Sequence, residues 1–307
     1  MRYKYTSFLL FCLLSISCLK EPVTFEWIEK DKTKLQQETL PFSGIIVFIK
    51  DNDIYMTDSL RFKNPKRLTF NGNELKKNVT INYSRDKIAY IDYTSTQPYP
   101  IIIDTNGVEQ MRLPTYTLIK EMSWSNDGNT LVMRKGTNLL FYGSAFSISI
   151  PNINSSSGFY YGFAMSRNKD IAYVYYLYAG SFEGNKVDFF STSRIDRSNT
   201  INSVDNTKMQ FSNDANNLLV ANLGYDLDGI EKAYVYNLID FTYTTAFSGN
   251  TTSRIKDISL SADSKYAIYS SQFLNNEVYN LYYKNLTDGT EKVFYTSASP
   301  ISSIDCR

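Results

Sequence analysis

The sequence predicts an all-β fold, a six-bladed β-propeller built from four-stranded blades. Three observations predict it. The 307 residues include 25 Tyr and 19 Phe, and aromatic and β-branched side chains suit the pleated surface of a strand. A short hairpin pattern recurs at intervals of about 40 to 50 residues, which is typical of propeller blades. The two ends of the repeat region also complement each other, as closure of a ring requires.

The first 17 residues have the layout of a secretory signal peptide. Arg2 and Lys4 precede an apolar run at residues 8–16, which is too short to span a bilayer, and small residues follow. The segment 14–18 (LSISC) resembles the lipobox of bacterial lipoproteins, with Leu14 one place further from the cysteine than usual. The resemblance implies that Cys18 is lipidated and anchors the chain to a membrane. The alternative is a plain signal peptide with a coincidental cysteine.

Residues 18–43 are mostly charged and polar, so we expect a lipidated tether before a propeller at residues 44–307. Leu19, rather than Asp, follows Cys18, which by enterobacterial sorting rules favours the outer membrane of a bacterial cell envelope. Cys12 lies in the cleaved leader and Cys18 carries the lipid. Only Cys306 is then left as a thiol, and no internal disulfide is expected.

Five segments share an alternating strand, a Ser-x-Asp or Ser-x-Asn turn, and a second apolar strand. In this alignment the serines are separated by 41, 41, 46 and 49 residues, and they are Ser84, Ser125, Ser166, Ser212 and Ser261. Serine and aspartate side chains bond back to nearby amides, so each motif predicts a tight hairpin. The pairs Asn106-Gly107 and Asp288-Gly289 predict further hairpin turns later in their blades.

The ends of the repeat region predict how the ring closes. Residues 45–70 read as the second to fourth strands of a blade that lacks its first strand. Residues 301–306 read as a first strand with no blade after it. We therefore expect the C-terminal strand to pair with the strand at residues 45–50, which removes both free edges of the ring.

The segments 53–58 (DIYMTD), 66–70 (KRLTF) and 124–128 (WSNDG) resemble the propeller repeat of TolB and of related propellers beside prolyl-oligopeptidase domains. The resemblance covers about residues 44–307 and implies the fold. TolB carries an α/β domain before its propeller, whereas a short tether occupies that position here. The resemblance therefore does not transfer the whole role of TolB.

Composition excludes several classes of function. The chain has no His, which removes Ser-His-Asp and Cys-His catalysis and His-ligated zinc. The net charge is +1 and no basic block is present, so nucleic acid is not an expected partner. Two hypotheses remain: a noncatalytic envelope lipoprotein that binds a protein or a peptidoglycan or glycan component, and a metal-dependent or carboxylate-based enzyme that acts on a sugar or lactone.

Candidate site residues lie on the face that carries the longer loops. Tyr160, Tyr161, Tyr178 and Phe182 form a candidate partner-binding platform, because tyrosine combines contact area with a hydroxyl group. The alternative is that they pack between blades. Asp226, Asp228 and Glu231 place three carboxylates within six residues, as calcium sites often do. The alternative there is a solvated turn, and no other cofactor is expected.

Overall fold

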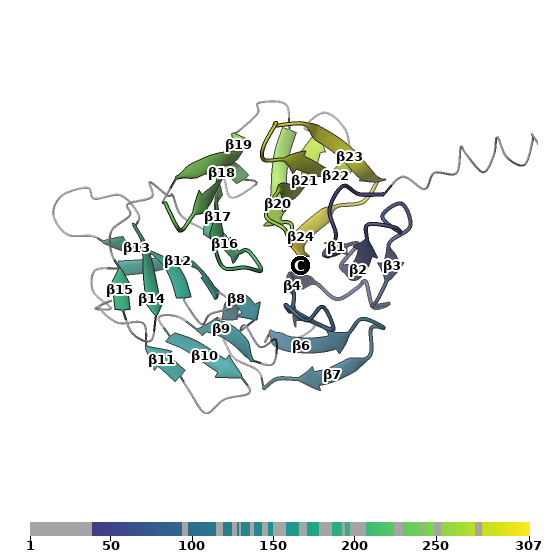
Figure 1. Ribbon diagram of the computed structural model, residues 1–307. Coiled ribbons are helices and arrows are strands. Elements are labelled where there is room, and N and C mark those ends of the chain that lie inside the picture. The colour runs from purple at the N-terminus through teal and green to yellow at the C-terminus, as the bar shows by residue number, and fades with distance from the viewer. Residues whose placement is uncertain are drawn as a thin grey trace, which may run out of the picture. The chain divides into compact units, whose positions relative to one another are not determined.

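The computed structural model describes residues 39–307 except 94–97, 115–118, 125–127, 129, 136–137, 143–146, 150–157, 166–170, 178–185, 192–193, 197–206, 224–229, 241, 249–252 and 274–277. The described residues form strands, turns and connecting segments. Leu40–Arg307 makes one compact unit. Its strands form an all-β propeller in which the sheets are arranged around a central axis (Figure 1).

Four of the sheets have four strands each, and every hydrogen-bonded pair in them is antiparallel. From the axis outward, the first sheet contains β24 (Ile301–Cys306), β1 (Ile45–Lys50), β2 (Asp53–Asp58) and β3 (Lys66–Arg67). The second contains β4 (Lys76–Ile81), β5 (Lys87–Asp92), β6 (Tyr99–Asp104) and β7 (Glu109–Arg112). The third contains β8 (Ile119–Trp124), β9 (Leu131–Lys135), β10 (Asn138–Tyr142) and β11 (Ser147–Ser149). The fourth contains β12 (Gly158–Met165), β13 (Ile171–Leu177), β14 (Lys186–Ser191) and β15 (Arg194–Asp196).

The fifth sheet has eight strands, so the prediction of six separate blades is corrected to five sheets. Its strands are β16 (Thr207–Phe211), β17 (Asn217–Leu223), β18 (Ile230–Asn237), β19 (Tyr243–Ser248), β20 (Ser253–Leu260), β21 (Tyr266–Phe273), β22 (Tyr279–Asn285) and β23 (Glu291–Ser297). One residue pair, Ile230 with Ile255, connects β18 to β20 and merges two runs of four strands. The sequence could not reveal this, because the pair joins strands of different repeats.

The predicted closure of the ring is confirmed. Strand β24 pairs with β1 in antiparallel register from Ile46 and Cys306 to Lys50 and Ile301. Two further hydrogen bonds between Ile45 and Arg307, of 2.8 and 3.1 Å, extend this ladder. The C-terminal end of the chain therefore lies beside the axis, next to β4 (Figure 1).

The hairpin motif closes turns as predicted, but its alignment changes in the second sheet. Ser212 Oγ accepts the amide of Asn217 at 2.9 Å, and Ser261 Oγ accepts that of Tyr266 at 3.0 Å. In the second sheet Asn82 holds this position, and its Oδ1 accepts the amides five and four residues later at 3.0 Å. Asn82, rather than Ser84, is thus the equivalent residue.

Backbone conformation supports the corrected alignment. The residue three places after each described capping side chain has a positive φ: Arg85 (63°), Ala215 (61°) and Ser264 (61°). Gly107 also has a positive φ of 88°, and a Cβ there would lie 2.2 Å from the carbonyl oxygen of Leu68. Glycine is therefore required at position 107 both by the turn and by the close approach of the first sheet.

Apolar layers lie between neighbouring sheets. One cluster joins Val47, Ile49 and Ile54 of the first sheet to Ile81 and Ile88 of the second. Another joins strands β17–β19 to β20–β22, so the two halves of the fifth sheet also enclose a core. Because both faces of a sheet are covered, inner strands such as β1 and β5 are buried almost continuously, whereas the described rim strand β7 is exposed.

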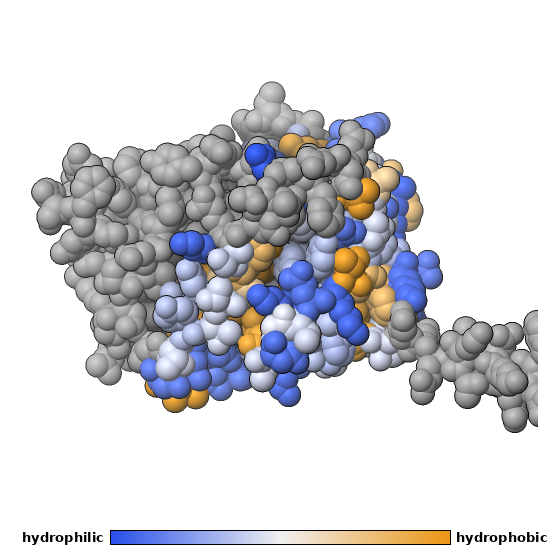
Figure 2. All heavy atoms as spheres, turned by 90° about the horizontal axis from the view of Figure 1, so that it is seen from above, coloured by the Kyte–Doolittle hydropathy of each residue, from blue (hydrophilic) through white to orange (hydrophobic). Residues whose placement is uncertain are grey.

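The core begins before the first strand. Leu40 and Phe42, which the sequence assigned to the tether, are 5% and 3% exposed and pack with Phe48 and Ile304. Figure 2 shows that the described side chains on one side of the molecule are mostly hydrophilic, with scattered apolar groups between them. Within the described residues, no helix is long and apolar enough to cross a membrane.

Candidate functional site

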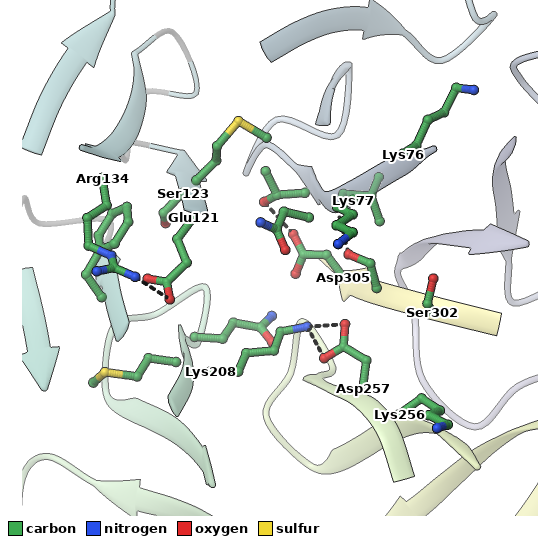
Figure 3. A pocket seen from close by; sticks show the side chains of 18 of the residues that line it. Lys76, Lys77, Glu121, Ser123, Arg134, Lys208, Lys256, Asp257, Ser302 and Asp305 are labelled. Carbon is green, nitrogen blue, oxygen red and sulfur yellow. Dashed lines mark hydrogen bonds and ion pairs between the residues drawn. The ribbon is translucent and has the colours of Figure 1, made fainter. Parts of the chain in front are cut away.

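A cavity of about 570 Å³ lies on the axis of the propeller, where the innermost strands β4, β8, β12, β16, β20 and β24 approach one another. Each of these strands contributes at least one residue to its lining, and β9 adds Arg134. The volume falls within the range of about 300 to 1,000 Å³ that is usual for ligand sites. Figure 3 shows that the labelled polar side chains come from several sheets and surround this space.

Gln210 on β16 joins three of the innermost strands. Its Nε2 donates to the carbonyl oxygens of Leu260 (3.2 Å) and Cys306 (3.0 Å). Its Oε1 accepts the amide of Leu260 and the hydroxyl of Ser259, both at 2.8 Å. Gln210 is only 4% exposed, and because no backbone ladder joins the described strands β16, β20 and β24 to one another, its side chain supplies the hydrogen bonds between them.

Asp305 on β24 connects this strand to β4. Its Oδ2 accepts the hydroxyl of Thr80 at 2.8 Å and the amide of Ile81 at 2.9 Å. Nearby, Ser303 Oγ accepts the amide of Val79 at 2.8 Å. The closing strand is therefore fixed on both sides, by its ladder with β1 and by side chains to β4.

Asp257 on β20 forms an ion pair in the cavity wall through both of its carboxylate oxygens. Lys208 Nζ lies 2.8 and 2.9 Å from its two carboxylate oxygens (Figure 3). The amide of Ile304 also donates to Oδ2 of Asp257. Lys208 also donates to the carbonyl oxygen of Ile304. The pair thus links β16, β20 and β24 and places one neutralised carboxylate in the wall.

A second ion pair lies across the cavity. Arg134 Nη2 is 3.3 Å from Glu121 Oε1, and the Arg134 residue is 8% exposed (Figure 3). Lys76 also belongs to the wall, but its ammonium group points away from the cavity. It lies 3.6 Å from Asp53 and donates to the carbonyl oxygens of Asn71 and Glu74.

Arg307 lies at the end of the cavity where the innermost strands terminate. Its guanidinium group is 4.4 Å from the ring centre of Tyr83, and its Nη1 donates to the carbonyl oxygen of Phe211. Its Nε is buried and has no hydrogen-bond acceptor among the described residues, the nearest Asp305 oxygen being 3.9 Å away. Burial lowers the pKa of Arg307, but Tyr83, Asp305 and Cys306 raise it more, so it stays charged.

Two of the three segments that resemble TolB, 53–58 and 66–70, have a structural role in the first sheet. Asp53 is fully buried, and Thr69 Oγ1 donates to its Oδ1 at 2.7 Å while Arg67 forms an ion pair with its Oδ2. A Cβ at Gly72 would lie 3.0 Å from the same carboxylate. This network around the buried Asp53 joins β2 to β3 and to the segment after it, which leads the chain into β4.

The residues that the sequence nominated for binding are only partly described. Tyr160 and Tyr161 lie on β12, and the register with β13 shifts between Tyr160 and Gly162. Glu231 lies on β18, but the structure does not describe the side chains of these three residues. Cys18, Tyr178, Phe182, Asp226 and Asp228 lie outside the described residues. Within the described part, no group of three His, Cys, Asp or Glu residues is arranged to hold a metal ion.

Sequence reasoning missed the cavity residues. A signal for them exists, because polar side chains interrupt the apolar first strands of the repeats, as at Lys208 and Gln210, Lys256 and Asp257, and Asp305. That signal marks positions on strands, but it does not show which strands meet at the axis.

Comparison with known proteins supports the fold. No protein-family model and no curated protein sequence matches the chain. Among solved structures, TolB from Acinetobacter baumannii is similar with a TM-score of 0.65 and 13% identity, covering 90% of this chain and 69% of that one. The chain has a TolB-like β-propeller fold.

Two other similar structures are a protein from a complex and an enzyme. A chain of a nidogen/laminin complex gives a TM-score of 0.61 and 9% identity, covering 86% of this chain and 98% of its own. An oligogalacturonate lyase in complex with manganese gives 0.51 and 10% identity, covering 84% and 75%. A fold shared by an enzyme and by a protein complex leaves the function to be argued from the site.

Proposed function

We propose that this chain is a noncatalytic lipoprotein of the bacterial cell envelope whose propeller binds an envelope protein or a cell-wall glycan. In this proposal Cys18 carries the lipid that holds the propeller at the membrane, and the face with the longer loops contacts the partner. The proposal rests mainly on how the carboxylates of the central cavity are used.

Each described carboxylate in the cavity wall already has a structural contact. Asp257 is paired with Lys208, Asp305 accepts bonds from Thr80 and Ile81, and Glu121 is paired with Arg134. A general acid or base must exchange a proton with its substrate in the transition state. For Asp257 and Asp305, this exchange would break bonds that hold neighbouring innermost strands together. The structural use of these two carboxylates therefore favours binding over a reaction that they would catalyse.

The test is capture of a partner from envelope extract by the lipid-free propeller. The double variant Y178A/F182A removes two candidate aromatic anchors, and truncation of such an anchor typically costs at least about 2 kcal/mol of binding free energy. We expect it to lose the captured partner. Y243A, which truncates an exposed tyrosine on the rim strand β19, is the matched control and should retain it.

Circular dichroism must first show that each variant is folded. Retention of every partner by Y178A/F182A would remove these residues from the binding surface. Turnover of a sugar or lactone by the wild type, with or without a divalent metal, would favour the enzyme hypothesis instead. Equilibrium dialysis with calcium tests the predicted site at Asp226, Asp228 and Glu231 in the same preparation.

A further inference from the structure

The lining of the central cavity has more positive than negative side chains. Apart from Lys76, which points away, its described cations are Lys77, Arg134, Lys208, Lys256 and Arg307. Its described carboxylates are Glu121, Asp257 and Asp305. Among its described side chains the lining therefore has two positive charges in excess, in a protein whose whole sequence has a net side-chain charge of only +1.

Positive side chains lie along the length of the cavity. Lys77 is exposed at the start of β4, where its Nζ lies 5.3 Å from the ring centre of Tyr93. Lys256 is half-buried near the start of β20. Arg307 lies at the opposite end of these strands, beyond Asp305 of β24. An anion that enters between the two lysines would thus approach a guanidinium group at the far end.

Arg307 supplies the second observation that points to a ligand. The residue is 4% exposed and lines the cavity, yet its Nε has no hydrogen-bond acceptor among the described residues. A buried donor without a partner is costly and calls for an acceptor. Guanidinium groups bind carboxylate and phosphate oxygens in a planar, often two-point geometry.

We propose that the central cavity binds a small oxyanion, with Arg307 at its inner end and Lys77 and Lys256 nearer the entrance. The ligand class is a solute that carries a carboxylate or phosphate group and fits within about 570 Å³. This site goes beyond the proposed function and does not depend on it, because no candidate partner-binding residue belongs to the described lining of the cavity.

The test is calorimetric titration of the lipid-free protein at constant ionic strength with three probes: glucuronate, citrate and inorganic phosphate. We expect saturable binding of at least one probe, and the probe that binds distinguishes a carboxylate from a phosphate ligand. K77M and K256M should each weaken binding about fivefold, as expected for loss of one charge several ångströms from the anion in a partly solvated site.

K265M is the matched control, because Lys265 is exposed in the turn between β20 and β21, away from the lining. It should bind as the wild type does. R307K keeps the positive charge but loses the guanidinium group and should also weaken binding. Thermal unfolding of each variant, measured without ligand, separates loss of the site from loss of the fold.

Absence of saturable binding to all three probes would overturn the proposal, as would equal weakening by K265M and K256M. The two proposals fail separately. Loss of partner capture by Y178A/F182A together with no anion binding would leave the binding-module function standing and remove the cavity site. Anion binding that requires Lys256, without any captured partner, would support the cavity site and remove the binding-module function.

Discussion

Substitution of Gln210 tests whether polar side chains hold the innermost strands together. In Q210L the volume is nearly retained, but the amide of Leu260 and the carbonyl oxygens of Leu260 and Cys306 lose their partner. A buried group left without its hydrogen bond costs about 1 to 3 kcal/mol, and a buried leucine recovers part of this. We expect a net loss of about 3 kcal/mol, which lowers the Tm by about 9 °C in a domain of this size.

The variant Q210E separates the loss of hydrogen bonds from a packing defect. At pH 8 its carboxylate would face the carbonyl oxygens of Leu260 and Cys306, which raises the pKa of the introduced carboxyl above its usual value. A raised pKa contributes stability at low pH that is lost as the pH rises through the folded-state value. The destabilisation relative to wild type should therefore be smaller at pH 5 than at pH 8, by about 1 to 2 kcal/mol.

Chemical denaturation at the two pH values measures both variants. Q110L is the control, because Gln110 is exposed on β7, and its effect should stay within about 0.5 kcal/mol. The reasoning is refuted if Q210L unfolds like the wild type. It is also refuted if the penalty of Q210E is the same at pH 5 and pH 8, since a simple packing defect has no such dependence.

Three further predictions concern the ring, the buried thiol and the anchor. Deletion of residues 301–307 removes the buried Ile301 and Ile304, so it should lower the Tm far more than a truncation that begins the chain at Leu40. Equal melting temperatures for the two truncated proteins would contradict the closure of the ring. Burial raises the pKa of the Cys306 thiol to about 12, so as the pH rises the thiol loses its proton in the unfolded chain before it does in the folded one. The free energy of unfolding should therefore fall with rising pH above pH ~9. In alkaline thermal scans, C306A should reduce this fall by up to about 1.4 kcal/mol per pH unit. C18A should move the protein from the membrane to the soluble fraction or leave it unprocessed, and unchanged fractionation would count against lipidation of Cys18.

Local features of the fold could be read from the sequence, because neighbouring residues determine them. The hairpin turns depend on a side chain that bonds amides a few residues away, and Asn106-Gly107 supplies the positive φ of a tight turn. Where two polar residues compete for this role, as Asn82 and Ser84 do, the sequence alone chose the wrong one. The closure of the ring was also predictable, since an incomplete first blade and an extra last strand complement each other.

The number of sheets and the cavity depend on contacts between distant repeats. The single pair of Ile230 with Ile255 decides that the fifth sheet has eight strands. Thr80 and Asp305, which form one hydrogen bond, are 225 residues apart, and Gln210 bonds a carbonyl oxygen 96 residues away. A strand pattern specifies which side chains share a face, but it does not specify which other strands that face will meet. The sequence by itself therefore determined the propeller repeat and its closure, whereas only the tertiary structure brought Lys208, Asp257, Asp305 and Arg307 to one axis.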